Sequence, residues 1–341
     1  VRRQRTSTRR WMTPVLEQGT SRSTASKRPF HSVRQGRDQS ACAVLTKGDP
    51  CLSRFSFRVG SRCSWRSVAV RRALPLVAAM MAADFFDNPS RKLTLVGITG
   101  TNGKTTTVTL LYHLFMAQGY NCGLLSTIAN YVGTRRLETA NTTADPITIN
   151  RLMSEMVDTG CEFCFMEVSS IGVEQERVAG LEFKVGIFSN LTHDHLDYHK
   201  TFAEYLRCKK LFFDNLPATA TAITNIDDKN GEVMVQNTKA KVVRYSCRSI
   251  ADHTCRIMEE TFEGMLLKID GRETWTRLIG QHNAYNILAI YSAAIAVGAD
   301  PEETLVAISK LESAPGRLEV ISGPRNLSVV IDYAHTPDAL E

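Results

Sequence analysis

The chain has 341 residues, of which 43% are hydrophobic and 22% charged, a balance typical of a soluble globular protein with room for two domains. Its net charge of +6 is uneven: residues 1–72 hold 17 Lys and Arg against 3 Asp and Glu, a net +14 that leaves −8 for residues 73–341. This distribution argues against a nucleic-acid-binding surface on the folded part, and the longest apolar run, 73–83, is too short to span a membrane.

Residues 1–72 are rich in Arg, Ser and Thr and show no sustained periodicity, so no helix or strand is predicted there. Three interpretations are open for this segment. It fits a transit peptide, which is rich in Arg and Ser and poor in acidic residues. It also fits a disordered basic arm, or sequence foreign to the native protein such as a frameshifted translation. The chain starts at Val1 without a Met, which leaves an incomplete chain open as well.

From residue 73 onward, strand-like and helix-like segments alternate. Strands are predicted at 93–99, 163–168, 184–189, 220–225 and 242–245, with a hairpin at 264–276. Helices are predicted at 105–118, 147–157, 202–213, 283–297 and 301–311. Such alternation predicts an α/β fold over residues 73–313, with a mostly parallel sheet flanked by helices. A further strand at 327–332 predicts that another domain begins in residues 314–341 and is cut off at residue 341.

A glycine loop joins the first predicted strand to the first predicted helix, with the sequence Thr99-Gly100-Thr101-Asn102-Gly103-Lys104-Thr105-Thr106. A strand, a glycine loop ending in Gly-Lys-Thr and a helix together present backbone N–H groups and a helix N-terminus to phosphate. We therefore expect ATP or GTP to bind here, with Lys104 at the β- and γ-phosphates and the Thr105 hydroxyl on Mg²⁺. The strict pattern has glycine at the position of Ile98.

The nine cysteines are scattered along the chain, which fits a reducing compartment better than a disulfide framework. Cys161 and Cys164 form one C-x-x-C pair. No second pair and no suitably spaced histidine follows it, so we favour buried structural cysteines over a zinc site.

Several motifs, taken together, resemble the Mur ligase family. The loop at 99–106 has the form that Mur ligases share with folylpolyglutamate and cyanophycin synthetases. Further motifs resemble the MurE branch of the family: Asn141-Thr142-Thr143, Glu167-Val168-Ser169-Ser170, Gln175, Arg177 and the run Asn190-Leu191-Thr192-His193-Asp194-His195-Leu196-Asp197-Tyr198-His199. The resemblance extends from about residue 73 to residue 341, and it implies that residues 73–313 are the central, ATP-binding P-loop domain of such a ligase. It also implies that residues 314–341 are the start of its Rossmann-like C-terminal domain.

Enzymes of this branch add the third residue, meso-diaminopimelate or L-lysine, to UDP-N-acetylmuramoyl-L-alanyl-D-glutamate in peptidoglycan synthesis, on which cell shape and division depend. The resemblance therefore implies an ATP- and Mg²⁺-dependent acid–amino-acid ligase that works through an acyl phosphate. Its partners would be the UDP-muramoyl-dipeptide and a free amino acid, with neither nucleic acid nor a membrane. It would be a cytoplasmic monomer, and an organelle stays open if residues 1–72 are a transit peptide.

The resemblance also assigns site residues, position by position. The UDP-muramoyl-dipeptide would be held by Asn141, Thr142, Thr143, Ser169, Gln175 and Arg177. The nucleotide would be held by Gly100, Thr101, Asn102, Gly103, Lys104, Thr105 and Thr106, together with Asn283, Asn286, Arg317 and Asp332. Two Mg²⁺ ions would be bound by Thr105, Glu167, His195 and Lys209. Lys104, His195 and Lys209 would be catalytic, and Asp332 would reach the nucleotide only when the C-terminal domain closes.

Two of the implied metal ligands agree with elementary chemistry. Glu167 ends an apolar strand, where a carboxylate is unfavourable unless it faces a cation. Lys209 would be carbamylated, which turns a cationic side chain into the anionic oxygen ligand that Mg²⁺ prefers. Lys210 then points elsewhere, because adjacent helical residues do not share a face. Magnesium takes at most one imidazole of the histidine run, so His193 and His199 are expected to pack within the loop.

Plainer explanations remain open for single residues. Thr142 and Thr143 could cap the helix that begins near Ala144, and Asn283 could cap its own helix. Arg177 could be a surface arginine, and Lys209 could lie on a solvated helix face.

The chain departs from the family pattern at Ile171, where histidine usually follows the serine pair, and polar contacts near the substrate should change there. Two rival functions are also open: a related ligase of the cyanophycin or folylpolyglutamate synthetase type, or an inactive nucleotide-binding remnant.

Overall fold

The computed structural model describes residues 68–192, 199–322 and 328–334, all within one compact unit, residues 62–341. The first element is the helix α1 (Val68–Phe85), which contains Pro75 and is followed by the short 3-10 helix η1 (Pro89–Arg91). The change of character expected at residue 73 falls inside α1. The reason is that the first five residues of this helix include Arg71 and Arg72, which composition groups with the basic segment before it.

An 11-stranded sheet organises the described residues, in the order β11-β10-β9-β8-β7-β6-β1-β5-β2-β3-β4. Its centre, from β9 to β2, is parallel, and antiparallel strands extend it on both sides. The parallel strands are β1 (Thr94–Thr99), β2 (Cys122–Leu125), β5 (Phe163–Glu167), β6 (Val185–Phe188), β7 (Thr221–Asn225) and β8 (Lys241–Ser246). The outer strands are β3 (Asn130–Val132), β4 (Arg135–Leu137), β9 (His253–Thr261), β10 (Gly264–Ile269) and β11 (Arg272–Thr276). The predicted α/β class with a mostly parallel sheet is confirmed.

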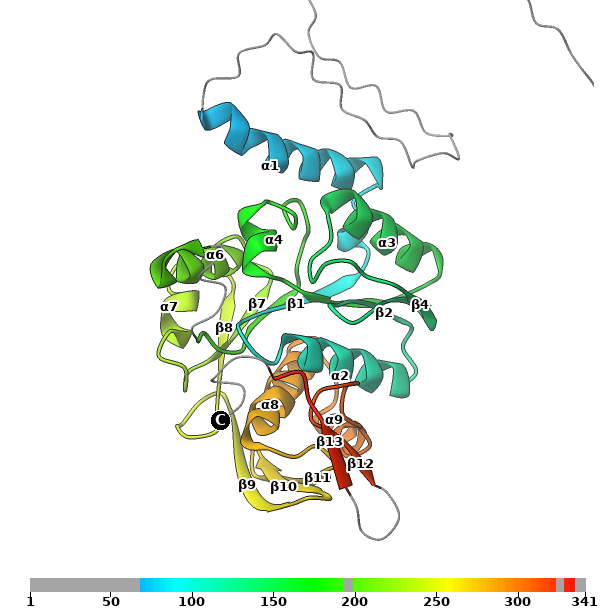
Figure 1. The fold of residues 1–341 in the computed structure, drawn as a ribbon, viewed down its shortest axis with the longest axis vertical. Coiled ribbons are helices and arrows are strands. Elements are labelled where there is room, and N and C mark those ends of the chain that lie inside the picture. The colour runs from blue at the N-terminus through cyan, green and yellow to red at the C-terminus, as the bar shows by residue number, and fades with distance from the viewer. Residues whose placement is uncertain (1–67, 193–198, 323–327, 335–341) are drawn as a thin grey trace, which may run out of the picture. The chain divides into compact units, whose positions relative to one another are not determined.

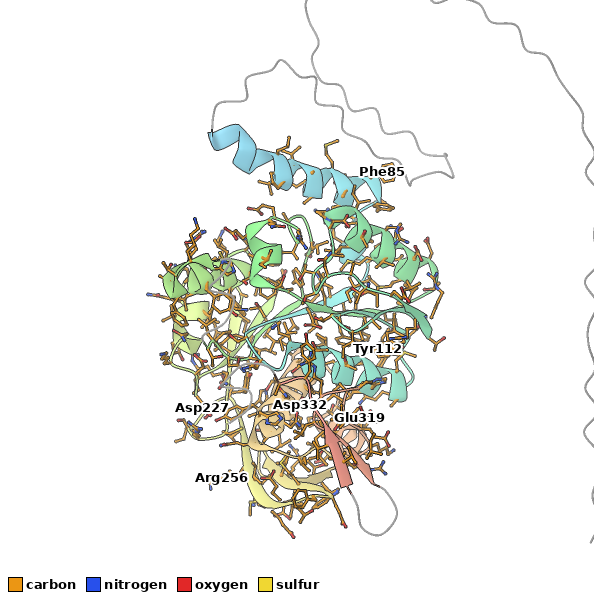
Figure 2. The ribbon with its side chains drawn as sticks, viewed as in Figure 1. Phe85, Tyr112, Asp227, Arg256, Glu319 and Asp332 are labelled. Carbon is orange, nitrogen blue, oxygen red and sulfur yellow. The ribbon has the colours of Figure 1, made fainter. Side chains whose placement is uncertain are left out.

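Helices cover both faces of the sheet, as Figure 1 shows. One layer consists of α2 (Lys104–Ala117), α8 (Gln281–Ala296) and α9 (Pro301–Ile308), which share a buried apolar cluster with β1 and β5. The opposite layer consists of α3 (Pro146–Asp158), α4 (Ser170–Glu174), α6 (Phe202–Asp214) and α7 (Gly231–Val235). Side chains fill the space on both sides of the sheet, visible in Figure 2. No helix in the described part of the chain is both long and apolar enough to cross a membrane.

The elements that were predicted match their observed ranges to within about three residues, but the helix α1, the strand β9 and several short strands were missed. The strands β2, β3 and β4 have only three or four residues each, too few for a periodic pattern to show. Gly123 in β2 further weakens the sequence signal of this buried strand, because glycine is uncommon in strand interiors. It is needed there because an added Cβ would lie 2.2 Å from the sulfur of Met156.

The predicted strand near residue 330 is β13 (Ser328–Ile331), which pairs antiparallel with β12 (Glu319–Ser322) in a separate two-stranded sheet. The parallel centre of the main sheet positions the functional site. In register, Ile98 of β1 pairs with Glu167 of β5, and Thr99 pairs with Phe188 of β6. Three segments that follow these strands therefore meet at one edge of the sheet, where ligands of open α/β sheets collect.

Candidate active site

The glycine loop wraps from the end of β1 to the start of α2. Gly103 has φ of 83° and immediately precedes the first helical residue, Lys104, so the helix N-terminus opens into the loop. An added Cβ would lie 1.9 Å from Ser189 Oγ at Gly100, and 2.4 Å from Asn286 Oδ1 at Gly103. Both positions therefore require glycine. Ile98, at the position where the strict pattern has glycine, is fully buried within β1 and belongs to the core instead of the loop.

The segment after β6 anchors the outer side of this loop. The backbone N–H of Asn102 donates to Asn190 Oδ1 at 2.8 Å, and Ser189 Oγ donates to the carbonyl of Asn102 at 2.7 Å. The Thr101 hydroxyl lies 3.1 Å from the hydroxyl of Tyr205 on α6. Sequence reasoning missed Ser189 and Tyr205 as supports of the loop. The only available signal was that Asn190 opens the histidine-containing run.

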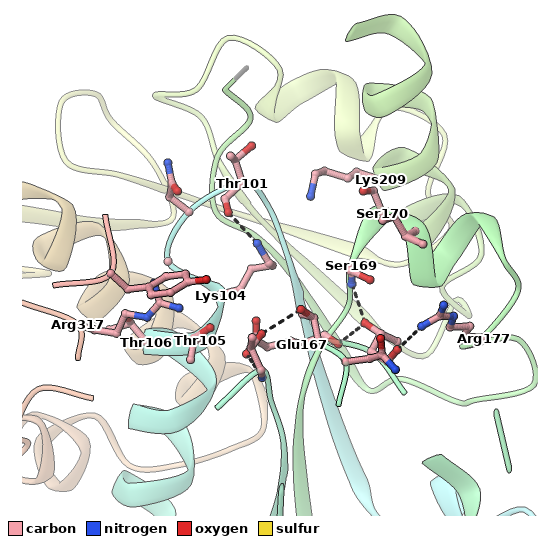
Figure 3. A pocket seen from close by; sticks show the side chains of 18 residues that line it. Thr101, Lys104, Thr105, Thr106, Glu167, Ser169, Ser170, Arg177, Lys209 and Arg317 are labelled. Atoms are coloured by element: carbon pink, nitrogen blue, oxygen red, sulfur yellow. Dashed lines mark hydrogen bonds between the residues drawn. The ribbon is translucent and has the colours of Figure 1, made fainter. Parts of the chain in front are cut away.

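Lys104 lies over the loop in a position suited to phosphate. Its Nζ donates to the carbonyl oxygens of Gly100 at 2.9 Å and Thr101 at 2.7 Å, so the ammonium group is held within the curve of the loop (Figure 3). Its predicted place among the phosphate-binding residues agrees with this geometry.

Glu167 is fully buried at the carboxyl end of β5. Its Oε1 accepts a hydrogen bond from the backbone N–H of Thr127 at 2.7 Å. Its Oε2 is buried with no hydrogen-bond partner among the described residues. A buried carboxylate oxygen without a donor is costly unless a cation faces it. Since Thr105 and Glu167 line the same pocket, their oxygens fit the hard-oxygen ligand set of Mg²⁺.

Lys209 is almost completely buried on α6, which makes the solvated-face explanation wrong. Its Nζ donates to the carbonyl of Gly100 at 2.6 Å and lies 4.7 Å from the centre of the Tyr205 ring. Lys210 points away, as expected, and its Nζ pairs with Asp214 at 2.6 Å. The structure therefore brings Lys209, and not its neighbour, to the phosphate loop.

A second polar group lies beside Glu167 and is built around Thr143. The Thr143 hydroxyl donates to the carbonyl of Glu167 at 3.0 Å and accepts from the backbone N–H of Ser169 at 2.9 Å. The Arg177 guanidinium donates to the carbonyl of Thr143 at 2.7 Å and to Gln175 Oε1 at 2.6 Å. Arg177 is thus half-buried, and local acceptors hold its guanidinium in one orientation at the pocket.

Helix capping does not explain the threonine pair. The cap of α3 is Asp145, whose carboxylate accepts from the N–H groups of Ile147 and Thr148. Thr142 instead accepts a hydrogen bond from the Thr127 hydroxyl at 3.1 Å. Ser169 is a true cap, because its Oγ accepts from the backbone N–H at the start of α4. Its predicted substrate role therefore coexists with a structural one.

One pocket of about 350 Å³ collects most of the predicted residues (Figure 3). The predicted residues that line it are Thr101, Asn102, Gly103, Lys104, Thr105, Thr106, Asn141, Thr142, Thr143, Glu167, Ser169, Arg177, Lys209 and Arg317. Thr127, Ser170, Ile171 and Tyr333 also line it, and sequence reasoning assigned none of them a binding role. Five predicted residues do not line the pocket: Gly100, Gln175, Asn283, Asn286 and Asp332. The remaining one, His195, lies outside the described residues.

Two asparagines of α8, Asn283 and Asn286, lie next to the glycine loop. Asn283 is the third residue of this helix, whose cap is Gly280, so the capping explanation is wrong. Its Nδ2 donates to the carbonyl of Ile279 at 2.8 Å, and its Oδ1 accepts from Asn286 at 3.0 Å. Asn286 in turn touches the loop at Gly103.

The residues after position 314 reach the pocket through Arg317. Its guanidinium lies 4.6 Å from the centre of the Tyr333 ring, and both residues line the pocket. Asp332 is exposed, and its carboxylate accepts from the backbone N–H groups of Leu318 and Tyr333. In this structure Asp332 therefore stabilises the hairpin and does not line the pocket.

His199 packs as predicted for the histidines that bind no magnesium. Its ring is buried, with Nε2 at 2.8 Å from Ser170 Oγ and the ring 5.3 Å from that of Tyr205. Burial lowers the pKa of His199, opposed in part by the negative charge of Glu174. The other histidine expected to pack, His193, lies outside the described residues.

Comparison with known proteins gives a consistent picture. The profile of the Mur ligase middle domain matches residues 98–296. The UDP-N-acetylmuramoyl-L-alanyl-D-glutamate–2,6-diaminopimelate ligase of Parabacteroides distasonis is 54% identical over 261 residues, covering 76% of this chain and 54% of that protein. One of the enzymes with this name from Clostridium acetobutylicum is 40% identical over 316 residues, covering 91% of this chain and 62% of that protein. The chain thus spans about half the length of the curated relatives it matches.

Solved structures give the same match. A UDP-N-acetylmuramoyl-L-alanyl-D-glutamate–2,6-diaminopimelate ligase superimposes with a TM-score of 0.68 and 29% identity, over 81% of this chain and 57% of that one. The folylpolyglutamate synthase of Mycobacterium tuberculosis superimposes with a TM-score of 0.62 over 77% of this chain and 68% of that one. At 17% identity, it shows only that the fold is shared.

Proposed function

Since the chain belongs to the Mur ligase family, we propose that it carries the ATP-binding centre of a UDP-N-acetylmuramoyl-L-alanyl-D-glutamate–2,6-diaminopimelate ligase. The family depends on ATP and Mg²⁺ in general. The observation that carries the proposal is the pocket itself, which is lined by the phosphate loop, Glu167 and the Thr143–Arg177 group together. An enzyme that phosphorylates a carboxylate must hold a polyphosphate and an anionic substrate side by side, and this pocket has donors for both.

The nucleotide is assigned to the loop side. The N–H groups at the start of α2 and the Lys104 ammonium supply positive charge for the phosphates. Asn286 supports the loop from α8, and Arg317 lines the same pocket beside Thr105 and Thr106, with the Tyr333 ring next to its guanidinium (Figure 3). We propose that residues 314–341 belong to a C-terminal ligase domain, which would bring Asp332 to the nucleotide when it closes.

Magnesium is assigned to the carboxylate and hydroxyl oxygens between the two halves of the pocket. Glu167 Oε2 and the Thr105 hydroxyl would hold one ion, and carbamylated Lys209 with His195 would hold a second. Bound Mg²⁺ would neutralise the charge on the phosphate oxygens. The position of Lys209 Nζ at the loop supports this role, since a carbamate formed there from CO₂ would place its oxygens beside the phosphates.

The UDP-muramoyl-dipeptide is assigned to the Thr143 side. Arg177, oriented by Gln175 and the carbonyl of Thr143, would pair with an anionic group of this substrate, and Asn141, Thr142 and Ser169 would supply further polar contacts. Ile171 faces the same pocket without a polar group, so substrate contacts at that point are apolar.

The proposed reaction has two steps. A γ-carboxylate oxygen of the bound glutamyl residue attacks the γ-phosphorus of ATP, so that the bond to ADP breaks and an acyl phosphate forms. The amine of the incoming amino acid then attacks the acyl carbon, phosphate leaves, and the amine proton passes to solvent. Lys104 counters the negative charge that develops on the transferred phosphoryl group. We propose that the protein does this as a monomer on free substrates, with neither nucleic acid nor a membrane.

Substrate-dependent turnover by the purified chain tests this proposal. ADP release should require UDP-N-acetylmuramoyl-L-alanyl-D-glutamate and 2,6-diaminopimelate together, and L-lysine should not replace the latter. The Lys104→Ala variant should lose nucleotide binding. Binding of ATP without substrate-dependent ADP release would favour the inactive remnant, and turnover with a folate or a cyanophycin primer would favour the related ligases. Failure to bind ATP at all would overturn all of these functions.

A further inference from the structure

Three side chains of the kinds that bind metals meet behind the wall of the pocket. They are Glu174 at the end of α4, His199 before α6 and Cys208 within α6. One carboxylate oxygen, one imidazole nitrogen and the thiol sulfur all lie within 4.8 Å of one another. His199 Nδ1 lies 3.9 Å from Glu174 Oε2. None of the three has a role in the ligase reaction proposed above.

The orientation of the imidazole suits metal binding. His199 Nε2 lies 2.8 Å from Ser170 Oγ, so this nitrogen is hydrogen-bonded to the serine hydroxyl. When Nε2 donates its proton to that oxygen, Nδ1 carries the lone pair and faces Glu174. A hydrogen bond from the second ring nitrogen is the usual way in which proteins fix the tautomer of a metal-binding histidine.

The thiol and the carboxylate complete a mixed ligand set. Cys208 is fully buried, and Arg207 Nη2 lies 3.9 Å from its sulfur. Burial raises the pKa of this thiol to about 11, so a thiophilic cation binds by displacing the thiol proton. Arg207 is itself paired with Glu204. The side chain of Glu174 is 34% exposed, so the cluster has a solvent-facing side through which an ion and a water molecule could enter.

The chemistry of the cluster differs from that of the magnesium pocket. Mg²⁺ avoids thiolate and binds oxygen, whereas Zn²⁺ and Co²⁺ accept sulfur, nitrogen and oxygen together in four-coordinate sites. Three protein ligands leave one position for water. We propose that Glu174, His199 and Cys208 form a second metal site, selective for Zn²⁺ or a similarly thiophilic divalent cation. Binding releases the thiol proton to solvent as the metal–sulfur bond forms.

Occupation of this site would link two elements of the pocket wall. Glu174 and Ser170 lie on α4, which packs against α6, where Cys208 precedes Lys209. Ser170 and Lys209 both line the pocket. A bound ion would therefore hold α4 against α6 at the point where each contributes a side chain to the pocket, and the free energy of unfolding would rise with metal concentration.

Cobalt absorption tests the site directly in the full chain. With excess Mg²⁺ present to fill oxygen-rich sites, Co²⁺ should give a near-ultraviolet thiolate-to-metal charge-transfer band at one ion per chain, and Zn²⁺ should abolish it. Cys208→Ser should remove the band, while the matched variant Cys247→Ser, on a half-buried cysteine after β8, should keep it. Absence of the band from the folded wild-type protein, or its survival in Cys208→Ser, would overturn the site.

A second variant covers the case in which Cys208→Ser does not fold. Glu174→Gln changes a partly exposed side chain, so its fold should persist, as circular dichroism would show. Equilibrium dialysis with Zn²⁺ under the same Mg²⁺ excess should show an affinity reduced by roughly 10-fold or more. Unchanged Zn²⁺ affinity in this variant would exclude the three-ligand site.

Discussion

Lys209 Nζ lies 2.6 Å from the carbonyl oxygen of Gly100, a residue 109 positions earlier in the chain. This contact joins the helix α6 to the phosphate loop and buries a lysine that would otherwise be expected at the surface. Burial of an ammonium group is costly unless local groups compensate it, and here the Gly100 carbonyl and the Tyr205 ring do so. Through this contact α6 contributes a buried cation to the phosphate loop.

Replacement of Lys209 by alanine should abolish ligase activity, because the proposed carbamate ligand is lost. Acetate or formate should restore part of the activity, since a free carboxylate can occupy the space of the carbamate. The direct measurement is a carbamate carbon signal by NMR after incubation with ¹³C-bicarbonate, present in the wild type and absent from Lys209→Ala. Lys210→Met is the matched control and should keep both signal and activity, because Lys210 pairs with Asp214 and not with the phosphate loop.

Replacement of Glu167 by glutamine should lower kcat by about 10²–10³-fold, the usual effect of removing one group that stabilises developing charge. The amide oxygen can still accept from the N–H of Thr127, so the fold should persist. The concentration of Mg²⁺ needed for half-maximal rate should rise. Glu162→Gln, an exposed carboxylate just before β5, is the control. Equal Mg²⁺ dependence in the two variants would contradict the assignment of Glu167 as a metal ligand.

Replacement of Arg177 by alanine should raise the KM for the UDP-muramoyl-dipeptide by roughly 10- to 100-fold, because a charged hydrogen-bond donor is lost. The affinity for ATP should not change, since Arg177 lies on the Thr143 side of the pocket. Steady-state kinetics with each substrate varied in turn would separate the two effects. Arg151→Ala, which removes an exposed arginine on α3 paired with Glu155, should alter neither value.

Replacement of Gly103 by alanine should destabilise the protein more than the same change at Gly119. Both glycines have positive φ, 83° and 94°, so both variants carry the backbone cost of about 1–2 kcal/mol. Only at Gly103 does the new methyl group meet an atom, Asn286 Oδ1 at 2.4 Å, whereas nothing lies within 4 Å at Gly119.

Urea denaturation should therefore show a further loss of about 1–3 kcal/mol for Gly103→Ala. An equal loss of unfolding free energy in the two variants would mean that the Asn286 side chain moves aside at no energetic cost. Its contact with Gly103 would then not determine the conformation of the loop.

The sequence by itself determined the α/β class, the main elements and the phosphate loop. These rest on information contiguous in the chain: a buried strand, a glycine loop and a helix follow one another at 94–117, and the periodic pattern of a long element is set by which of its residues are buried. The same local signals failed for β2, β3 and β4, which are too short to show a period.

Only the tertiary structure decided what single polar residues do. From the sequence, Thr143 could either cap a helix or bind the substrate. In the fold Asp145 caps the helix, and Thr143 is hydrogen-bonded to Glu167 and Ser169. The cluster of Glu174, His199 and Cys208 has no spacing that marks a metal site. The physical reason is the same in both cases: parallel strands and the helices packed on them bring together residues tens of positions apart, and no local pattern records which of them will meet.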